Sequence, residues 1–255
     1  MNNLSISRTP AAAGMAWIKQ GWHLFKQAPI PWTGMTALVF LVLMAVGMVP
    51  LAGLVVVHML SPFIVAGYMA ASRGGSRGET VSFIYLAAGW RENPSRNTLL
   101  LVGALYMLGT LLIFQLVKYF TDGDMQALLQ QTQNPAELTP EQAEQILATM
   151  LPAMALGTLL FAPLLMATWF APALVLFETF PAGKSLWWSL WACWMNWRSI
   201  LLYSLILGMI GMVALILPFG LGLLIFVPWT LTSTYAAYED IFLRVEPADP
   251  PIDVA

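Results

Sequence analysis

The sequence predicts an all-α membrane protein with about six transmembrane helices in three hairpins, each preceded by an amphipathic helix at the cytoplasmic interface. Hydrophobic residues make up 59% of the 255 residues and charged residues only 9%, whereas soluble domains carry about 25% charged residues. Six apolar segments each approach the roughly 20 residues that cross a hydrocarbon core as a helix. Lys and Arg also lie almost wholly on one side of these segments. The bilayer must therefore be the solvent for much of the chain.

Residues 11–28 come before the first long apolar run and predict a basic amphipathic helix. Its polar side chains fall in one arc of a helical wheel, opposite the apolar ones, and they are Lys19, Gln20, His23, Lys26 and Gln27. Pro29 and Pro31 are expected to end this helix and turn the chain into the membrane. The residues before it are polar, so we expect no cleavable signal peptide and interpret the first apolar run as a retained span.

The spans are predicted as helices because a membrane forces the backbone to satisfy its hydrogen bonds within each segment. They are residues 32–49, 51–71, 98–120, 151–177, 200–217 and 221–238. Pro50 alone separates the first two, and Pro218, Phe219 and Gly220 separate the last two. These short turns predict antiparallel hairpins that cover residues 32–71, 98–177 and 200–238.

Orientation follows from the excess of Lys and Arg that marks cytoplasmic segments. With the N-terminus inside, ten of the eleven basic residues fall on the cytoplasmic side and only Lys118 on the outer side. The outer loop, residues 121–150, is acidic, and Thr139 with Pro140 predicts a helix start within it. We therefore expect a bacterial-type inner membrane, both termini in the cytoplasm, and a cytoplasmic tail at 239–255.

Two further interfacial segments are expected, before the second and third hairpins. Residues 79–92 form a short segment that is less cleanly amphipathic. Residues 184–197 hold five of the eleven tryptophans, and indole favours the interface because it has an apolar body and one hydrogen-bond donor. This third segment also carries a narrow stripe of small or polar side chains, namely Ser185, Ser189, Cys193 and Asn196.

An interfacial helix followed by a hairpin occurs three times in this scheme. The second helix of each hairpin also holds a similar tripeptide: Leu60-Ser61-Pro62, Phe161-Ala162-Pro163 and Phe226-Val227-Pro228. This self-similarity favours an internal repeat. The alternative is coincidence, since hairpins recur in any such protein and the chain has 17 prolines.

Two stretches carry a resemblance to known proteins. They are Trp17-Ile18-Lys19-Gln20-Gly21-Trp22-His23-Leu24-Phe25, and Gly183-Lys184-Ser185-Leu186 followed by Asn196-Trp197. With them, the arrangement resembles a family of uncharacterised bacterial six-span inner-membrane proteins. It is also distantly similar to the membrane domains attached to some glycerophosphodiester phosphodiesterases. The resemblance implies fold and location but no activity, because the catalytic domain of those phosphodiesterases has no counterpart in this sequence.

His58 lies inside the second span, where ionisable side chains are rare and often functional. Its candidate partners are Gln115 and Lys118, near the outer end of the third span. These three residues form the candidate intramembrane polar site. We favour the other interpretation, a neutral imidazole hydrogen-bonded to a neighbouring helix, because no acidic partner is present.

The other charged residues gather at the cytoplasmic boundary. Arg73 and Arg77 flank a glycine-rich turn, which is either a flexible basic turn or a site for an anionic lipid headgroup. The candidate lipid headgroup contacts are Lys19, Lys26, Arg73, Arg77, Trp187, Trp191 and Trp194. The candidate cytoplasmic ion pairs involve Glu178, Lys184, Arg198, Glu239 and Arg244, with solvated helix ends as the alternative.

The sequence holds no signature of catalysis, of a cofactor or of a metal site. Two histidines and one cysteine are too few for most metal sites, and no serine stands in a nucleophile elbow. We expect a non-enzymatic membrane protein that organises or senses the cytoplasmic leaflet through anionic lipids, or scaffolds a protein partner or a homo-oligomer. The alternative is a small-solute transporter or channel with His58 in its path. The scattered basic residues argue against nucleic-acid binding.

Overall fold

The computed structural model describes residues 4–49, 52–91, 93–131 and 140–242, and these residues form helices and connecting segments without a strand. The first hairpin follows α1 (Ala13–Gln27) and consists of α2 (Pro29–Gly47) and α3 (Ala52–Ser76). A 3₁₀ turn, η1 (Phe83–Ala87), and a single turn, α4 (Ala88–Arg91), lead into α5 (Asn93–Gln131). Within the segment predicted at 79–92, residues 83–91 form two short helical pieces, while residue 92 and residues 243–255, which include Arg244, lie outside the described residues.

The second half of the chain contains two breaks between helices. The fourth predicted span is divided into α6 (Pro140–Trp169) and α7 (Ala171–Glu178). The Trp-rich α8 (Ala182–Met195) is followed almost directly by α9 (Trp197–Ile216). The turn η3 (Pro218–Gly220) then leads into α10 (Leu223–Phe242). Gly220 has a φ of +70°, a conformation that glycine adopts without steric cost, which explains why this turn is so short.

Within the described residues, five helical stretches are long and apolar enough to cross a membrane: Pro29–Gly47, Gly53–Ser76, Ser95–Phe120, Met150–Glu178 and Trp197–Ile216. These coincide with the first five predicted spans. The sixth prediction falls on α10, which is not among the five. Hydroxyl side chains at residues 230 and 232–234, together with Glu239 and Asp240, lower the apolar content of that helix.

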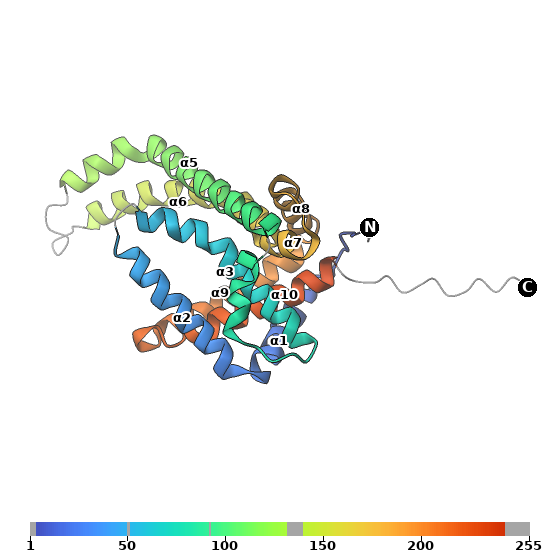
Figure 1. Cartoon of the computed structure of the whole chain (residues 1–255). Helices are drawn as coiled ribbons and strands as arrows, with labels where there is room; N and C mark the ends of the chain where they lie inside the picture. Colours follow the sequence, from blue (N-terminus) through green and yellow to red (C-terminus); the bar gives the residue numbers. More distant parts are fainter. Residues whose placement is uncertain (1–3, 50–51, 92, 132–139, 243–255) are drawn as a thin grey trace, which may run out of the picture.

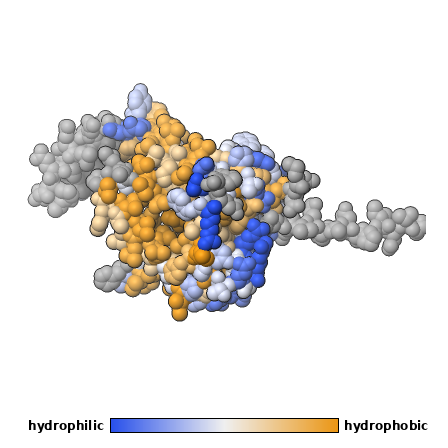
Figure 2. Space-filling view, in the orientation of Figure 1, coloured by the Kyte–Doolittle hydropathy of each residue, from blue (hydrophilic) through white to orange (hydrophobic). Residues whose placement is uncertain are grey.

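The long helices extend from a densely packed base (Figure 1). The base contains α1, α7 and α8, the first turns of α2, α5 and α9, and the last turns of α3 and α10, where most buried side chains lie. The largest of these buried side chains include Trp17, Trp32, Tyr68, Tyr203 and Tyr238. Away from the base, the helices expose apolar side chains, and hydrophobic residues cover that part of the surface (Figure 2). An exposed apolar surface of this extent is what lipid tails would cover.

The first helix joins this base through its apolar side. Trp17, Ile18, Leu24 and Phe25 are buried, and α1 packs mainly against α10 and α9. Its polar side chains, including Lys19 and Lys26, are exposed. The apolar side of α1 therefore contacts protein, and the position of the helix at a membrane interface stays a prediction.

Candidate functional site

His58 does not meet its predicted partners. Its Nδ1 lies 2.8 Å from the carbonyl oxygen of Leu54, one turn earlier in its own helix, and its ring lies 5.3 Å from that of Tyr106 on α5. Gln115 and Lys118 are exposed and lie nine and twelve residues beyond Tyr106, or about 13 and 18 Å along the helix. The expected bond to a neighbouring helix is likewise replaced by a bond within α3. The three residues do not form one site.

Three of the four tryptophans of α8 point away from the protein, while Trp188 packs against the core. Trp187, Trp191 and Trp194 are exposed, and the rings of Trp187 and Trp191 stack with 6.4 Å between their centres. The opposite side of the helix carries the small polar stripe, and its residues Ser185, Ser189 and Cys193 are buried. The stripe predicted from sequence is therefore the side that attaches α8 to the base, and it fixes the indoles outward.

Ser189 holds open the break between α6 and α7. In a continuous helix the Phe170 N–H would donate to the carbonyl oxygen of Met166. Instead, the Phe170 N–H donates to the Ser189 hydroxyl at 2.9 Å, and this hydroxyl donates to the Met166 oxygen at 2.6 Å. Pro172 has no N–H to continue the ladder at this point. A side chain inserted into the ladder of helical bonds is a recognised cause of a sharp bend.

A basic hollow of about 480 Å³ lies where α3, η1, α4 and α7 meet, and we call it the Arg73 hollow. Its lining includes Arg73, Arg77 and Arg91 together with Glu79 and Tyr85. The Arg73 guanidinium lies 4.5 Å from the centre of the Phe177 ring, a cation–π contact that fixes its position. The Tyr85 hydroxyl donates to Glu79 at 2.5 Å, and this bond raises the pKa of Tyr85. Sequence reasoning found Arg73 and Arg77 but missed Arg91.

The residues predicted to form ion pairs contact aromatic groups in the described part of the chain. Tyr238 donates to Glu178 at 3.2 Å, and Tyr235 donates to Glu239 at 2.7 Å. The Lys184 ammonium lies 3.7 Å from the centre of the Phe180 ring, and the Arg198 guanidinium 5.4 Å from that of Trp197. At Glu178 a tyrosine hydroxyl thus takes the place that Lys or Arg was expected to fill, while a pair with Arg244 lies outside the described residues.

The N-terminal segment is tied to the junction between α8 and α9, which sequence reasoning missed. Asn196 donates to the Ser7 carbonyl oxygen at 3.0 Å and accepts from the Thr9 N–H at 2.7 Å. The Ser199 hydroxyl donates to the Pro10 carbonyl oxygen at 2.9 Å, and the Ser7 N–H donates to the Ile241 oxygen at 2.8 Å. These contacts join residues at least 187 positions apart, so no local pattern reveals them.

The described residues contain no group of three or more His, Cys, Asp or Glu side chains that could hold a metal ion. Two other hollows lie among the long apolar helices. One of about 500 Å³ lies between α5 and α6 and is lined mainly by apolar side chains. One of about 180 Å³ lies beside the helix break and is lined by Ser61, Tyr106 and Thr168, among others.

No family model matches the chain, and no solved structure matches it. A protein of Burkholderia thailandensis described as a probable inner membrane protein is 28% identical over 265 residues, which cover 97% of each chain. This match extends over both the long apolar helices and the base. The chain is an integral inner-membrane protein. Its several helical spans agree with the location that the sequence predicted, while the likeness to phosphodiesterase membrane domains stays a prediction.

Proposed function

We propose that this protein is a non-enzymatic component of the inner membrane that binds and organises lipids of the cytoplasmic leaflet. The observation that carries the proposal is the outward tryptophan face of α8. Trp187, Trp191 and Trp194 are 62%, 46% and 63% exposed, although indole is among the side chains that gain most from burial. A membrane interface gives the ring an apolar surround and its N–H an acceptor.

The topology that we propose has six spans, with α10 as the sixth and both termini in the cytoplasm. The base then lies on the cytoplasmic side, because the N-terminal segment is bonded to it and the long apolar helices extend from it (Figure 1). The element order supports three related units, each a helix or pair of short turns followed by a hairpin: α1 with α2–α3, η1–α4 with α5–α7, and α8 with α9–α10.

Positive charge on the base supports a preference for anionic lipids. Lys19 and Lys26 are exposed on α1, and three arginines line the Arg73 hollow. Basic residues next to a span gain about 1 kcal/mol each from the negative surface of the cytoplasmic leaflet. The same surface would also suit a protein partner or a second copy of the chain, whose contacts would replace those with lipid.

The test is the stabilisation that lipid gives to the purified protein. Replacing Trp187, Trp191 and Trp194 with Ala should remove most of the rise in unfolding temperature when phospholipid is added in mild detergent. Leu205, Met209 and Met212, replaced with Ala, form the control, because these exposed apolar residues lie on the α9 span. A tryptophan variant stabilised by lipid as strongly as the wild type would contradict the proposal.

A second candidate function, passage of a small solute, is favoured by the hollow beside the helix break. Its lining includes Tyr106, whose ring contacts His58, and a broken helix is a common feature of transporter sites. We would place Tyr106→Cys in a Cys193→Ala background and add a water-soluble thiol reagent. Rapid labelling would support a hydrated path, whereas complete protection in the native protein would exclude one.

A further inference from the structure

A second basic hollow, of about 500 Å³, lies at the junction of α8 and α9, and we call it the Arg8 hollow. Two guanidiniums, one amide and three indoles line it: Arg8, Arg198, Asn196, Trp191, Trp194 and Trp197. Neither Arg8 nor Arg198 belongs to the Arg73 hollow on α3. Among the residues that the structure describes, this lining contains hydrogen-bond donors and aromatic rings and no carboxylate.

One network of hydrogen bonds fixes the backbone next to both arginines. Arg8 stands between Ser7 and Thr9, and Asn196 binds the backbone of both. Arg198 stands two residues after Asn196 and directly before Ser199, whose hydroxyl lies 2.9 Å from that of Thr9. Asn196 and Ser199 are buried, while the two arginines are exposed. The backbone positions of both cations are therefore fixed before any ligand arrives, which lowers the entropy cost of binding.

The start of α9 borders this hollow. The Asn196 side chain bonds to Ser7, Thr9 and Ala192, so it makes no capping bond to the first turn of α9. The first N–H groups of a helix have no partner within the helix. The two guanidiniums suit an anion, and their planar donor geometry matches both phosphate and carboxylate oxygens. At a membrane surface the phosphate of a lipid headgroup is the anion at hand.

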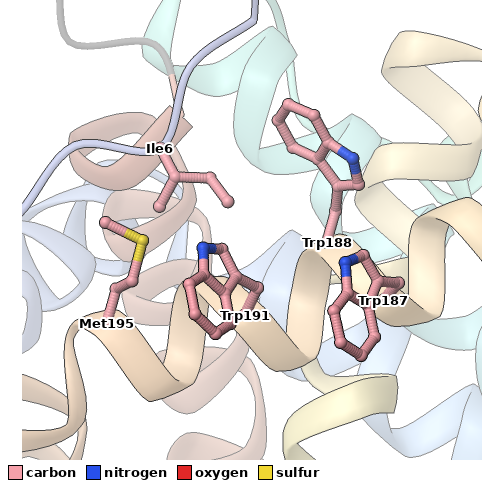
Figure 3. Close-up of a pocket in the computed structure, with 5 residues that line it drawn as sticks. All are labelled: Ile6, Trp187, Trp188, Trp191 and Met195. Carbon is pink, nitrogen blue, oxygen red and sulfur yellow. The ribbon is translucent and has the colours of Figure 1, made fainter.

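An apolar hollow continues from the basic one along α8. It is lined by Ile6, Trp187, Trp188, Trp191 and Met195, and it shares Trp191 and Met195 with the Arg8 hollow. Figure 3 shows Trp187 and Trp191 side by side on α8, with Trp188 beside them and Ile6 and Met195 at the other end. The combined surface is cationic at one end and aromatic at the other. Free phosphate would use only the first end, whereas a phospholipid uses both.

We propose that this surface binds one anionic phospholipid, with its phosphodiester between Arg8 and Arg198 and its upper acyl chains against Trp187 and Trp191. This inference rests on the proposed function, since it needs the tryptophan face to lie in the cytoplasmic leaflet. It goes beyond that function by naming a stoichiometric site and a headgroup class.

The test is native mass spectrometry of the full chain, released from vesicles of phosphatidylethanolamine with or without phosphatidylglycerol. We expect the wild type to retain one phosphatidylglycerol molecule. Arg8→Gln with Arg198→Gln should lower its retention about tenfold or more, because each charge-assisted bond to phosphate contributes strongly. Arg96→Gln with Lys118→Gln removes the same charge at positions outside both basic hollows and should retain the lipid. Equal loss from both double variants would show diffuse attraction and overturn the site.

Two further variants test how Arg8 and Arg198 are positioned, without changing the charge of the site. Asn196→Ala keeps both arginines but removes the side-chain hydrogen bonds to Ser7 and Thr9. Thr9→Val removes only the Thr9 hydroxyl from the same hydrogen-bond network. Both variants should lose phosphatidylglycerol while keeping the lipid-dependent rise in unfolding temperature that the tryptophan face supplies. Retention unchanged in both variants would overturn the proposal, as would displacement of the lipid by millimolar inorganic phosphate. The lipid-dependent rise in unfolding temperature of the tryptophan variant tests the proposed function only, and it is measured separately from the retention of phosphatidylglycerol.

Discussion

Single polar side chains in the base of this protein take over backbone hydrogen bonds that regular helices would make. Ser189 bridges the Phe170 N–H and the Met166 carbonyl oxygen, and Asn196 binds a segment that has no helical partner. The sequence shows Ser185, Ser189, Cys193 and Asn196 as one stripe. It does not show that the stripe faces protein, because a narrow polar stripe among tryptophans also suits an interfacial helix. The burial of their side chains decides between the two.

Ser189→Ala should destabilise the protein by about 1–3 kcal/mol, because it leaves the buried Phe170 N–H without its acceptor and the part-buried Met166 oxygen with only the weak Cys193 S–H donor at 3.7 Å. Ser185→Ala is the matched control: Ser185 is equally buried, one turn earlier, but its hydroxyl only donates to the Ala182 oxygen in its own helix. That change should cost less than about 1 kcal/mol. Thermal unfolding in detergent compares the two, and equal midpoints would show that the bridge contributes nothing to stability.

At the scale of elements, the contact between α1 and α10 depends on close approach of their backbones. A Cβ built on Gly21 would lie 2.4 Å from the Ser233 nitrogen, so only glycine fits there. Trp229 donates to the Ile18 oxygen and Thr232 to the Gly21 oxygen, both at 2.9 Å, and Trp17 donates to Asp240 at 2.9 Å. The wheel pattern of residues 11–28 predicts which side chains are apolar. Whether lipid or protein covers them depends on α10, more than 200 residues away, which no local pattern can show.

Gly21→Ala should therefore destabilise the protein by about 1–3 kcal/mol, since overpacking forces the two helices apart. Gly208→Ala is the control, because a Cβ on this α9 residue meets nothing within 4 Å. There the loss of backbone freedom in the unfolded chain should leave stability unchanged or raise it by up to about 1 kcal/mol. Unfolding midpoints measured in one detergent check both. A Gly21→Ala protein as stable as the wild type would mean that α1 is free to move away from α10.

For the whole molecule, hydropathy and charge predicted three features that the structure and the comparison support: five spans, an all-α chain and an inner-membrane location. They succeed because a bilayer imposes length and apolarity on each helix separately. They fail where the molecule departs from a simple bundle. The base buries Trp17, Trp32 and Tyr203 by packing elements from the whole length of the chain. His58 lies beside Tyr106, away from Gln115 and Lys118, because the position of a residue along its own helix does not fix which side chains of another helix it meets.

The orientation of the whole chain is tested by the accessibility of single cysteines. Burial raises the pKa of the only native thiol, Cys193, to about 12, so it stays protonated and unreactive at neutral pH; it is removed by Cys193→Ala all the same. In this background, Ser5→Cys and Thr80→Cys report on the base. Lys118→Cys and Glu141→Cys report on the parts of α5 and α6 that lie far from the base. All four positions are exposed.

In spheroplasts, a membrane-impermeant maleimide should label the cysteines at 118 and 141 and should label those at 5 and 80 only after the membrane is opened. The reason is the charge distribution, since crossing with the base outward would place ten of the eleven basic residues on the outer side. The reversed pattern would move the tryptophan face of α8 and both basic hollows to the outer leaflet, and the proposed role in the cytoplasmic leaflet would then be wrong. Labelling of one base position without the other would instead contradict an even number of spans between them, and so the first hairpin.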